Sequence, residues 1–360
     1  MRTIVITLIF LAMWGSAEAC SSAVVAPKLS KEKAVMIWKH RDQTATNDCR
    51  IAHFDDGKYS YTALINSYVR VGESTLAGIN EVGFGYISTA TKNLAREPED
   101  ENYSYKQYSK SLMCRALCEC RTVDEFEAFL ASENRYPSYQ SNIGVGDAEG
   151  NGAYFEIWSD GYRRYDVEGF DVRTNFSFAG RDDKRGTSIR RYKTVTEQMQ
   201  NQKMFSTQDL IGYSRCFWSA DKGDVIASSQ PYKDLSYVVP RQSSVASVVV
   251  VCSATNPRMD VIIGHPVVGM AVPVWVAAKH NIPKCVAGRK MYDLGREYVA
   301  KAYEKQGKNY YLNKKVTTEV LKINHDIKAP KSMPKDIVKF NNKVDQIFEK
   351  HRSQMMQILQ

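Results

Sequence analysis

Short hydrophobic runs separated by polar turns dominate the first part of the chain after its leading apolar segment. Runs of four to eight β-branched or aromatic residues, bounded by clusters such as Asp55-Asp56-Gly57, are typical of strands. We therefore predict strands at residues 22–26, 34–40, 50–53 and 59–66, and a strand–turn–strand unit at 78–89.

Helical and strand-like blocks then alternate. We predict helices at residues 105–120 and 123–131, and Thr122 with Glu125 three residues later forms a capping-box pattern before the second of them. A strand-rich block at 141–178 precedes helices at 188–200 and 207–213. Strands at 244–252 and 260–264 precede helices near 290–305, 317–323 and 334–359. This order predicts a layered α+β domain in which helices cover two sheets.

The first nineteen residues have the pattern of a secretory signal peptide. Arg2 provides a positive start, Ile4 to Met13 an apolar core, and Ala17-Glu18-Ala19 a small-x-small cleavage site. We expect residues 1–19 to be removed and the mature protein to comprise residues 20–360. The predicted location is therefore exported, either periplasmic or extracellular.

Cleavage after Ala19 would make Cys20 the first residue of the mature chain. Its thiol and its free α-amine would then form a nucleophile that carries its own base. Two alternatives remain at this point. Cys20 is either the lipid-modified cysteine of a surface lipoprotein, against which the acidic Glu18 argues, or an ordinary structural cysteine.

Composition narrows the classes of function. Hydrophobic residues at 43% and charged residues at 25% are ordinary values for a globular protein. Much of the net charge of +9 lies in the lysine-rich C-terminal third. We interpret it as a solvated basic face, with recognition of an anionic surface by an inactive scaffold as the alternative. No nucleic-acid-binding motif accompanies the charge, so no nucleic-acid partner is expected.

Cysteine and histidine spacing gives no sign of a metal site. Cys114, Cys118 and Cys120 fall in a helical segment without a nearby histidine, and we predict buried thiols there, with a disulfide as the second possibility. We expect neither a metal nor a cofactor.

Several short motifs follow Cys20 in a characteristic order. They are Trp38-Lys39-His40-Arg41-Asp42, Gly78-Ile79-Asn80-Glu81-Val82-Gly83, Val145-Gly146-Asp147-Ala148-Glu149-Gly150, Arg173-Thr174-Asn175 and Ser188-Ile189-Arg190-Arg191. Together with an N-terminal cysteine, this series resembles the choloylglycine hydrolase and penicillin-acyltransferase-like branch of the N-terminal nucleophile hydrolases. The resemblance covers roughly residues 20 to 264.

The resemblance implies a four-layer αββα sandwich. We expect a single domain from residue 20 to 360, in which residues from about 288 onward form a helical C-terminal extension. It also implies hydrolysis of a non-peptide, linear amide bond in a small-molecule substrate through a thioester. An acyltransferase that uses the same acyl-enzyme is the alternative, and members of the family often form homo-oligomers.

The resemblance also assigns roles to individual residues. Cys20 is the nucleophile, and Asp42 matches the residue that binds and orients its α-amine. Lys39 falls where bile-salt hydrolases carry an arginine, and Arg41 is the alternative for supporting the thiolate. Asn175 is expected to donate to the oxyanion. Arg191 is expected to support the site, with Arg190 as the alternative.

Overall fold

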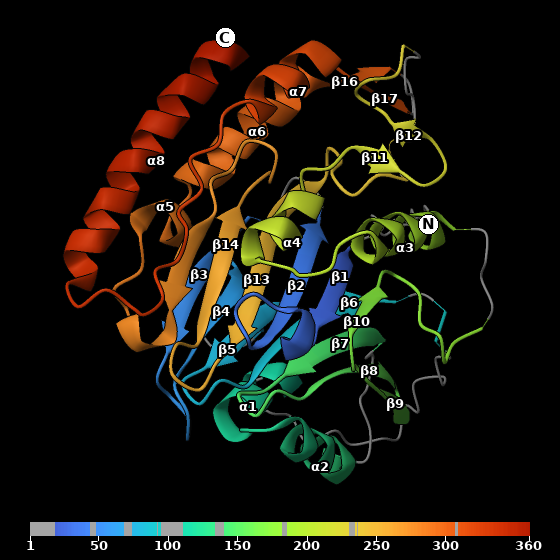
Figure 1. Cartoon of the computed structure of the whole chain (residues 1–360), viewed down its shortest axis with the longest axis vertical. Helices are drawn as coiled ribbons and strands as arrows, with labels where there is room; N and C mark the ends of the chain where they lie inside the picture. The colour runs from blue at the N-terminus through green and yellow to red at the C-terminus, as the bar shows by residue number, and fades with distance from the viewer. Residues whose placement is uncertain are drawn as a thin grey trace, which may run out of the picture.

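Two antiparallel β-sheets stacked face to face form the centre of the molecule (Figure 1). The computed structural model describes residues 19–43, 48–67, 74–91, 93–94, 111–133, 140–181, 186–229, 235, 237–306 and 309–360. The predicted signal peptide, apart from Ala19, and residues 105–110 of the first predicted helix lie outside these ranges.

The first sheet has six strands, and its second strand starts directly after Cys20. In spatial order it consists of β10 (Phe170–Arg173), β1 (Ser21–Val25), β2 (Val35–Asp42), β13 (Ser244–Cys252), β14 (Arg258–Ile263) and β15 (Val272–Trp275). All of these neighbours pair antiparallel. Strands β1, β2 and β13 are buried along their whole length, as expected for strands covered on both faces.

The second sheet is a seven-stranded meander whose spatial order follows the sequence. Its strands are β3 (Cys49–Phe54), β4 (Tyr61–Asn66), β5 (Ala77–Asn80), β6 (Gly85–Ala90), β7 (Ser141–Gly146), β8 (Gly152–Trp158) and β9 (Gly161–Asp166).

Paired glycines allow the two sheets to approach each other closely. Gly85 on β6 and Gly146 on β7 are register partners. A Cβ atom at Gly85 would lie 2.6 Å from Cγ1 of Val250, and one at Gly146 would lie 2.6 Å from Cγ1 of Val35. Any larger residue at either position would push against the first sheet, since packed interiors have few gaps of that size.

Helices cover the outer face of each sheet. Helices α3 (Thr187–Gln200) and α4 (Thr207–Tyr213) pack on the six-stranded sheet, and α1 (Leu112–Glu119) and α2 (Val123–Glu133) pack on the seven-stranded sheet. Figure 1 shows α3 and α4 in front of the first sheet. The predicted α+β class and the four-layer αββα order are thus confirmed.

The start of α2 agrees with its predicted N-cap but not with a full capping box. The Thr122 hydroxyl accepts a hydrogen bond from the Glu125 amide at 3.1 Å. The Glu125 carboxylate instead accepts from the amide of Arg121, one residue before the cap, at 2.7 Å. The Thr122 hydroxyl thus satisfies one orphan amide of the first turn, and the Glu125 carboxylate satisfies an amide just outside the helix.

The C-terminal part is mainly helical and packs at one side of the sandwich. It contains η2 (Val276–Ala278), α5 (Lys284–Ala287), α6 (Lys290–Ala302), the hairpin strands β16 (Tyr303–Gln306) and β17 (Asn309–Leu312), α7 (Lys314–Leu321) and α8 (Ile337–Leu359). Helix α5 contacts β3 and β14, and α8 packs on α5, α6 and α7. In the described ranges, no helix combines the length and apolar character that a membrane crossing requires.

A few elements differ from the sequence prediction. The helix predicted to reach residue 305 ends at Ala302, where the β16–β17 hairpin begins. Strand β15 and the two-residue pair β11 (Trp218–Ser219) and β12 (Gly223–Asp224) were not predicted, nor was the short 3₁₀ turn η1 (Pro27–Leu29). All eight cysteines are free thiols, and Cys114, Cys118 and Cys120 are buried, in agreement with the favoured interpretation.

Candidate active site

Cys20 lies directly before β1, which runs between β2, the strand of Lys39 and Asp42, and β10, the strand that ends two residues before Asn175. Its exposed fraction is 3%. Strand β1 pairs with β2 so that Ser22 is opposite Lys39, and it pairs with β10 so that Ser22 is opposite Arg173. Because side chains alternate along strands, Cys20, Ser22 and Lys39 point to the same face.

This register places the ammonium of Lys39 beside the thiol. Nζ of Lys39 lies 3.5 Å from Sγ of Cys20, and the same ammonium donates to the backbone carbonyl of Ser88 on β6. Lys39 therefore connects the two sheets and holds a positive charge at the sulfur. A cation in this position favours the thiolate over the thiol.

Arg41, the alternative partner for the thiolate, points elsewhere. Its guanidinium donates to the side-chain oxygen of Gln43 at 2.7 Å and to that of Asn66 at 2.8 Å. Of the two candidates, the structure brings Lys39 to Cys20.

Arg191 joins Cys20 to Asn175. Its Nη1 donates to the carbonyl oxygen of Cys20 and, at 2.9 Å, to Oγ of Ser21, while Nη2 donates to Oδ1 of Asn175 at 2.8 Å. Its neighbour Arg190 has a half-exposed side chain and pairs with Asp221 at 3.5 Å. The structure therefore brings Arg191, and not the alternative Arg190, into the site.

The charge of Arg191 is buried, and its environment is only partly favourable. Burial and the nearby Arg241 lower the pKa of Arg191 to about 9, and the charges of Asp42 and Cys20 oppose this shift. The side chain remains cationic at neutral pH.

The side-chain amide of Asn175 is held in one orientation. An arginine has only donors, so the atom that faces Arg191 must be the amide oxygen. The amide nitrogen donates to the carbonyl of Ala90 at 2.7 Å. An amide nitrogen carries two hydrogens, so one N–H of Asn175 is left for a further acceptor.

Asp42 ends β2 and lies in a buried polar cluster. Its Oδ1 accepts from Oγ of Ser244 at 2.7 Å and lies 2.9 Å from Nε2 of His40, and its Oδ2 lies 3.2 Å from Nε of Arg241. Burial on its own would raise the pKa of Asp42, but His40, Arg241 and Arg191 outweigh it and lower the pKa. Asp42 is therefore an anion at neutral pH.

Asp42 and Cys20 are connected through Arg191, whose pKa both of their charges influence. No hydrogen bond between these two residues is present in the described part of the structure, where the nitrogen of Cys20 belongs to the peptide bond with Ala19. Asp42 acts on the site electrostatically through Arg191, whose pKa it raises. Its expected contact with the free α-amine stays a prediction.

Three residues around Asp42 were missed by the sequence analysis: His40, Ser244 and Arg241. Ser244 is brought to Asp42 by the β2–β13 pairing, where a bulge separates the Asp42–Ser244 and Arg41–Ala246 pairs, and His40 is two residues before Asp42 on the same face of β2. His40 lay inside a quoted motif, but the other two lie far along the chain and have no local motif.

Asn80 and Asp147, which belong to two of the quoted motifs, hold turns of the second sheet against helices. The Asn80 side chain donates to the carbonyls of Leu117 and Cys120, which fixes the β5–β6 turn to α1. The carboxylate of Asp147 accepts from the amides of Glu149 and Asn151 and from that of Val123, which fixes the β7–β8 turn to α2. Among the residues that the structure describes, no group of three or more histidine, cysteine or acidic side chains is arranged to hold a metal ion.

Neither a protein-family model nor a curated protein matches the sequence. Solved structures do resemble this one. An N-acylethanolamine-hydrolyzing acid amidase ortholog from Caenorhabditis elegans is 15% identical, with 64% of this chain and 92% of that chain aligned and a TM-score of 0.43.

Two bacterial structures show similar values. A mutant of the conjugated bile acid hydrolase from Clostridium perfringens is 11% identical over 72% of this chain and 93% of that chain, with a TM-score of 0.43. The penicillin V acylase from Agrobacterium tumefaciens is 12% identical over 72% and 86%, with a TM-score of 0.46. All three are choloylglycine hydrolase-like members of the N-terminal nucleophile hydrolases, the family whose motifs this sequence resembles.

Proposed function

We propose that this protein is an exported cysteine amidase that hydrolyses a linear, non-peptide amide bond in a small molecule. Cys20 is the nucleophile and is made N-terminal by removal of the signal peptide. The observation that carries the proposal is the ammonium of Lys39, 3.5 Å from a thiol that directly follows the predicted signal cleavage site.

The reaction starts with the thiol of Cys20. Its proton passes to its own α-amine, and the sulfur attacks the carbonyl carbon of the amide. Lys39 stabilises the sulfur anion before the attack. The buried carboxylate of Asp42 favours the ammonium that the α-amine becomes, because opposite charges in a dry site attract strongly.

Attack moves negative charge onto the carbonyl oxygen of the substrate. The free N–H of Asn175 is the donor that we assign to this oxyanion, and Arg191 keeps the amide turned so that its nitrogen is available. When the tetrahedral intermediate collapses, the C–N bond breaks and the leaving amine takes the proton from the α-ammonium. Water then attacks the thioester, releases the acid and regenerates the thiol.

We also propose the partner, the location and the assembly state of the protein. The partner is the small-molecule amide, the location is periplasmic or extracellular, and assembly as a homo-oligomer is possible. The panel of amides to be tested starts with an N-acylethanolamine, a conjugated bile acid and penicillin V, which are the compounds named for the similar structures.

The test compares the mature protein with two cysteine variants on that panel. Release of free amine is expected for at least one amide, with no release by Cys20→Ala. Cys216→Ala is the matched control, because Cys216 is a free thiol next to Trp218, Asp224 and Gln198, and this variant is expected to retain full activity. Equal turnover by Cys20→Ala and the mature protein would disprove the proposal. Transfer of the acyl group to an added amine in preference to water would show that the protein is an acyltransferase and not a hydrolase.

A further inference from the structure

We infer that Glu156, a buried carboxylate on β8, is a positioning residue that holds Asn175 in place for the oxyanion. The inference rests on the proposed role of Asn175. Glu156 belongs to none of the sequence motifs and touches neither Cys20 nor Lys39 in the described structure.

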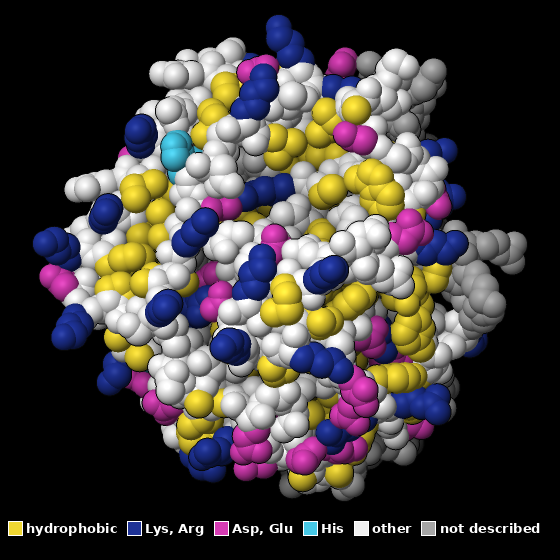
Figure 2. Space-filling model, viewed as in Figure 1, with side chains coloured by type: hydrophobic (Ala, Val, Ile, Leu, Met, Phe, Trp, Pro, Cys, Tyr) yellow, Lys and Arg dark blue, Asp and Glu magenta, His cyan; other side chains and the backbone are white. Residues whose placement is uncertain are grey.

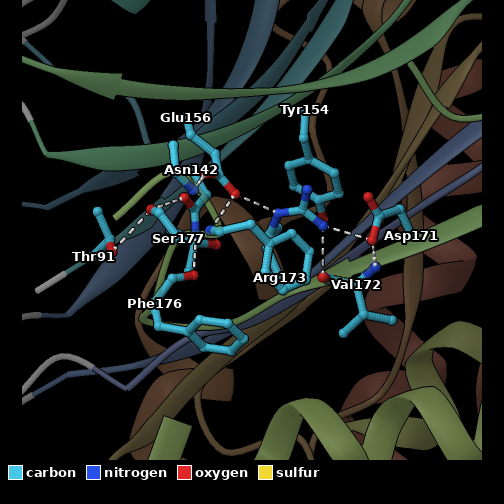
Figure 3. Close-up of polar contacts among 12 residues, drawn as sticks. Thr91, Asn142, Tyr154, Glu156, Asp171, Val172, Arg173, Phe176 and Ser177 are labelled. Atoms are coloured by element: carbon cyan, nitrogen blue, oxygen red, sulfur yellow. Dashed lines mark hydrogen bonds and ion pairs between the residues drawn. The ribbon is translucent and has the colours of Figure 1, made fainter. Parts of the chain in front are cut away.

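Glu156 binds both ends of the loop that carries Asn175, and Figure 3 shows its contact with Arg173 at the start of that loop. Its Oε1 accepts from Nε of Arg173 at 2.9 Å and from the amide of Phe178 at 2.9 Å, and its Oε2 accepts from the amide of Ala179 at 2.7 Å. Arg173 precedes Asn175 by two residues, and Phe178 and Ala179 follow it. One fully buried carboxylate thus fixes the entry and the exit of the loop.

Asn142 fixes the middle of the same loop. Its side-chain nitrogen donates to the carbonyls of Thr174 at 3.0 Å and Phe176 at 2.8 Å, which flank Asn175 on either side. Asn142 and Glu156 are direct partners across the β7–β8 pair, so their side chains lie on the same face of the second sheet. The second sheet therefore fixes the backbone conformation of the loop that carries Asn175.

These contacts matter for geometry more than for folding energy. A buried ion pair is weak support for stability, because desolvation consumes much of the attraction. A donor that is displaced by about 1 Å, however, lowers the rate of a reaction about 100-fold. Among the described residues, the hydrogen bonds of the Asn175 side chain go to Ala90 and Arg191, so its position also depends on where the loop backbone lies.

Glu156→Gln tests this inference with little change in shape. Both carboxylate oxygens face N–H donors, so a glutamine turns its NH₂ group against a donor in either orientation. Two reagents separate positioning from reactivity of the thiol. p-Nitrophenyl acetate acetylates Cys20 through an oxyanion, forming the C–S bond and releasing p-nitrophenolate. Iodoacetamide alkylates the sulfur without an oxyanion.

The expected result is a loss of about 10- to 100-fold in the rate of acetylation, with alkylation unchanged within about twofold. Asp171→Asn is the matched control. Asp171 also pairs with Arg173, at 2.6 Å, but it contacts none of residues 174–179 in the described structure, so both rates should be retained. If Glu156→Gln slows both reagents equally, or neither, the inference is wrong.

A double variant distinguishes this inference from the proposed function. In an Asn175→Ala background, Glu156→Gln should cost little further acetylation, because the two residues act through one donor. If the two substitutions instead lower the acetylation rate by the product of their separate factors, the inference is wrong. If the selective loss is found but no amide is ever hydrolysed, the positioning role stands and the amidase proposal fails.

Discussion

The ammonium of Lys39 and the thiol sulfur of Cys20 lie 3.5 Å apart, on side chains from two paired strands. The Ser22–Lys39 register of β1 and β2 is sufficient to produce this contact, since Cys20 is two residues before Ser22 and shares its face. Figure 2 shows that Lys and Arg side chains are scattered over the visible surface, but Lys39 is one of the few that is buried.

Replacing Lys39 by methionine should remove the charge that favours the thiolate. At an effective dielectric constant of 20, a unit charge about 4 Å away contributes about 4 kcal/mol before solvent screening. We therefore expect alkylation of Cys20 by iodoacetamide at neutral pH to slow at least about tenfold. Arg41→Met is the control from the same strand, and Lys39→Arg should recover part of the rate. An unchanged alkylation rate in Lys39→Met would show that Lys39 does not activate the thiol of Cys20.

Replacing Arg191 by methionine should slow acylation more than the same replacement of its exposed neighbour Arg190. The variant loses the contacts to the Cys20 carbonyl, to Ser21 and to Asn175, so the nucleophile and the oxyanion donor are no longer held together. A drop of about 100-fold in kcat is expected. Arg190→Met should stay within about twofold of the parent, because its pair with Asp221 lies at the surface. Equal losses in both variants would show that position 191 has no special role.

Asn175→Ala should remove one oxyanion donor. Such a loss typically lowers kcat about 100- to 1000-fold while KM changes little. Asn201→Ala, at the C-terminal end of α3, is a control, because the side chain of Asn201 donates to the Glu197 carbonyl of the same helix at 3.0 Å. A variant that loses affinity but keeps kcat would place Asn175 in substrate binding and not at the oxyanion.

Stability should fall as the pH drops below about 6.5, the usual pKa of histidine. Burial, with a contribution from His40, lowers the pKa of His265 to about 3. Its Nδ1 accepts from the Val267 amide at 3.3 Å and its Nε2 lies 2.9 Å from the Arg241 carbonyl, which defines a neutral ring. The unfolded chain then binds a proton that the folded chain does not, which costs about 1.4 kcal/mol per pH unit.

Urea unfolding at several pH values between about 4 and 6.5 measures this effect, because aspartates such as Asp42 titrate mainly below this range. His265→Gln keeps a donor for the Arg241 carbonyl and should show a smaller slope of unfolding free energy against pH. His351, whose pKa burial also lowers, will keep part of the slope. An identical slope in parent and variant would mean that His265 is protonated in the folded state.

The fold was largely predictable because most strands are short hydrophobic runs between clear turn residues. The elements that the sequence did not reveal have a physical reason. Strands β11, β12 and β16 are two to four residues long and amphipathic or polar, and β15 contains Pro273, which weakens a strand prediction.

The site was predictable where its residues follow Cys20 in a motif, and less so where pairing of distant strands creates it. Lys39 and Arg41 share a face of β2, so the sequence alone could not show which of them lies next to the Cys20 thiol. In the structure, Asn66 on the other sheet accepts a hydrogen bond from Arg41 and so directs its guanidinium to itself. Arg241 reaches Asp42 only because the loop before β13 lies next to the end of β2.

In the proposed mechanism, Cys20 is an N-terminal nucleophile with a free amine. The most direct measurement is the intact mass and N-terminal sequence of the exported protein. We predict an unmodified chain that starts at Cys20. A chain that carries a lipid mass on Cys20, or starts at another residue, would contradict the account, because the α-amine would not be available as the base.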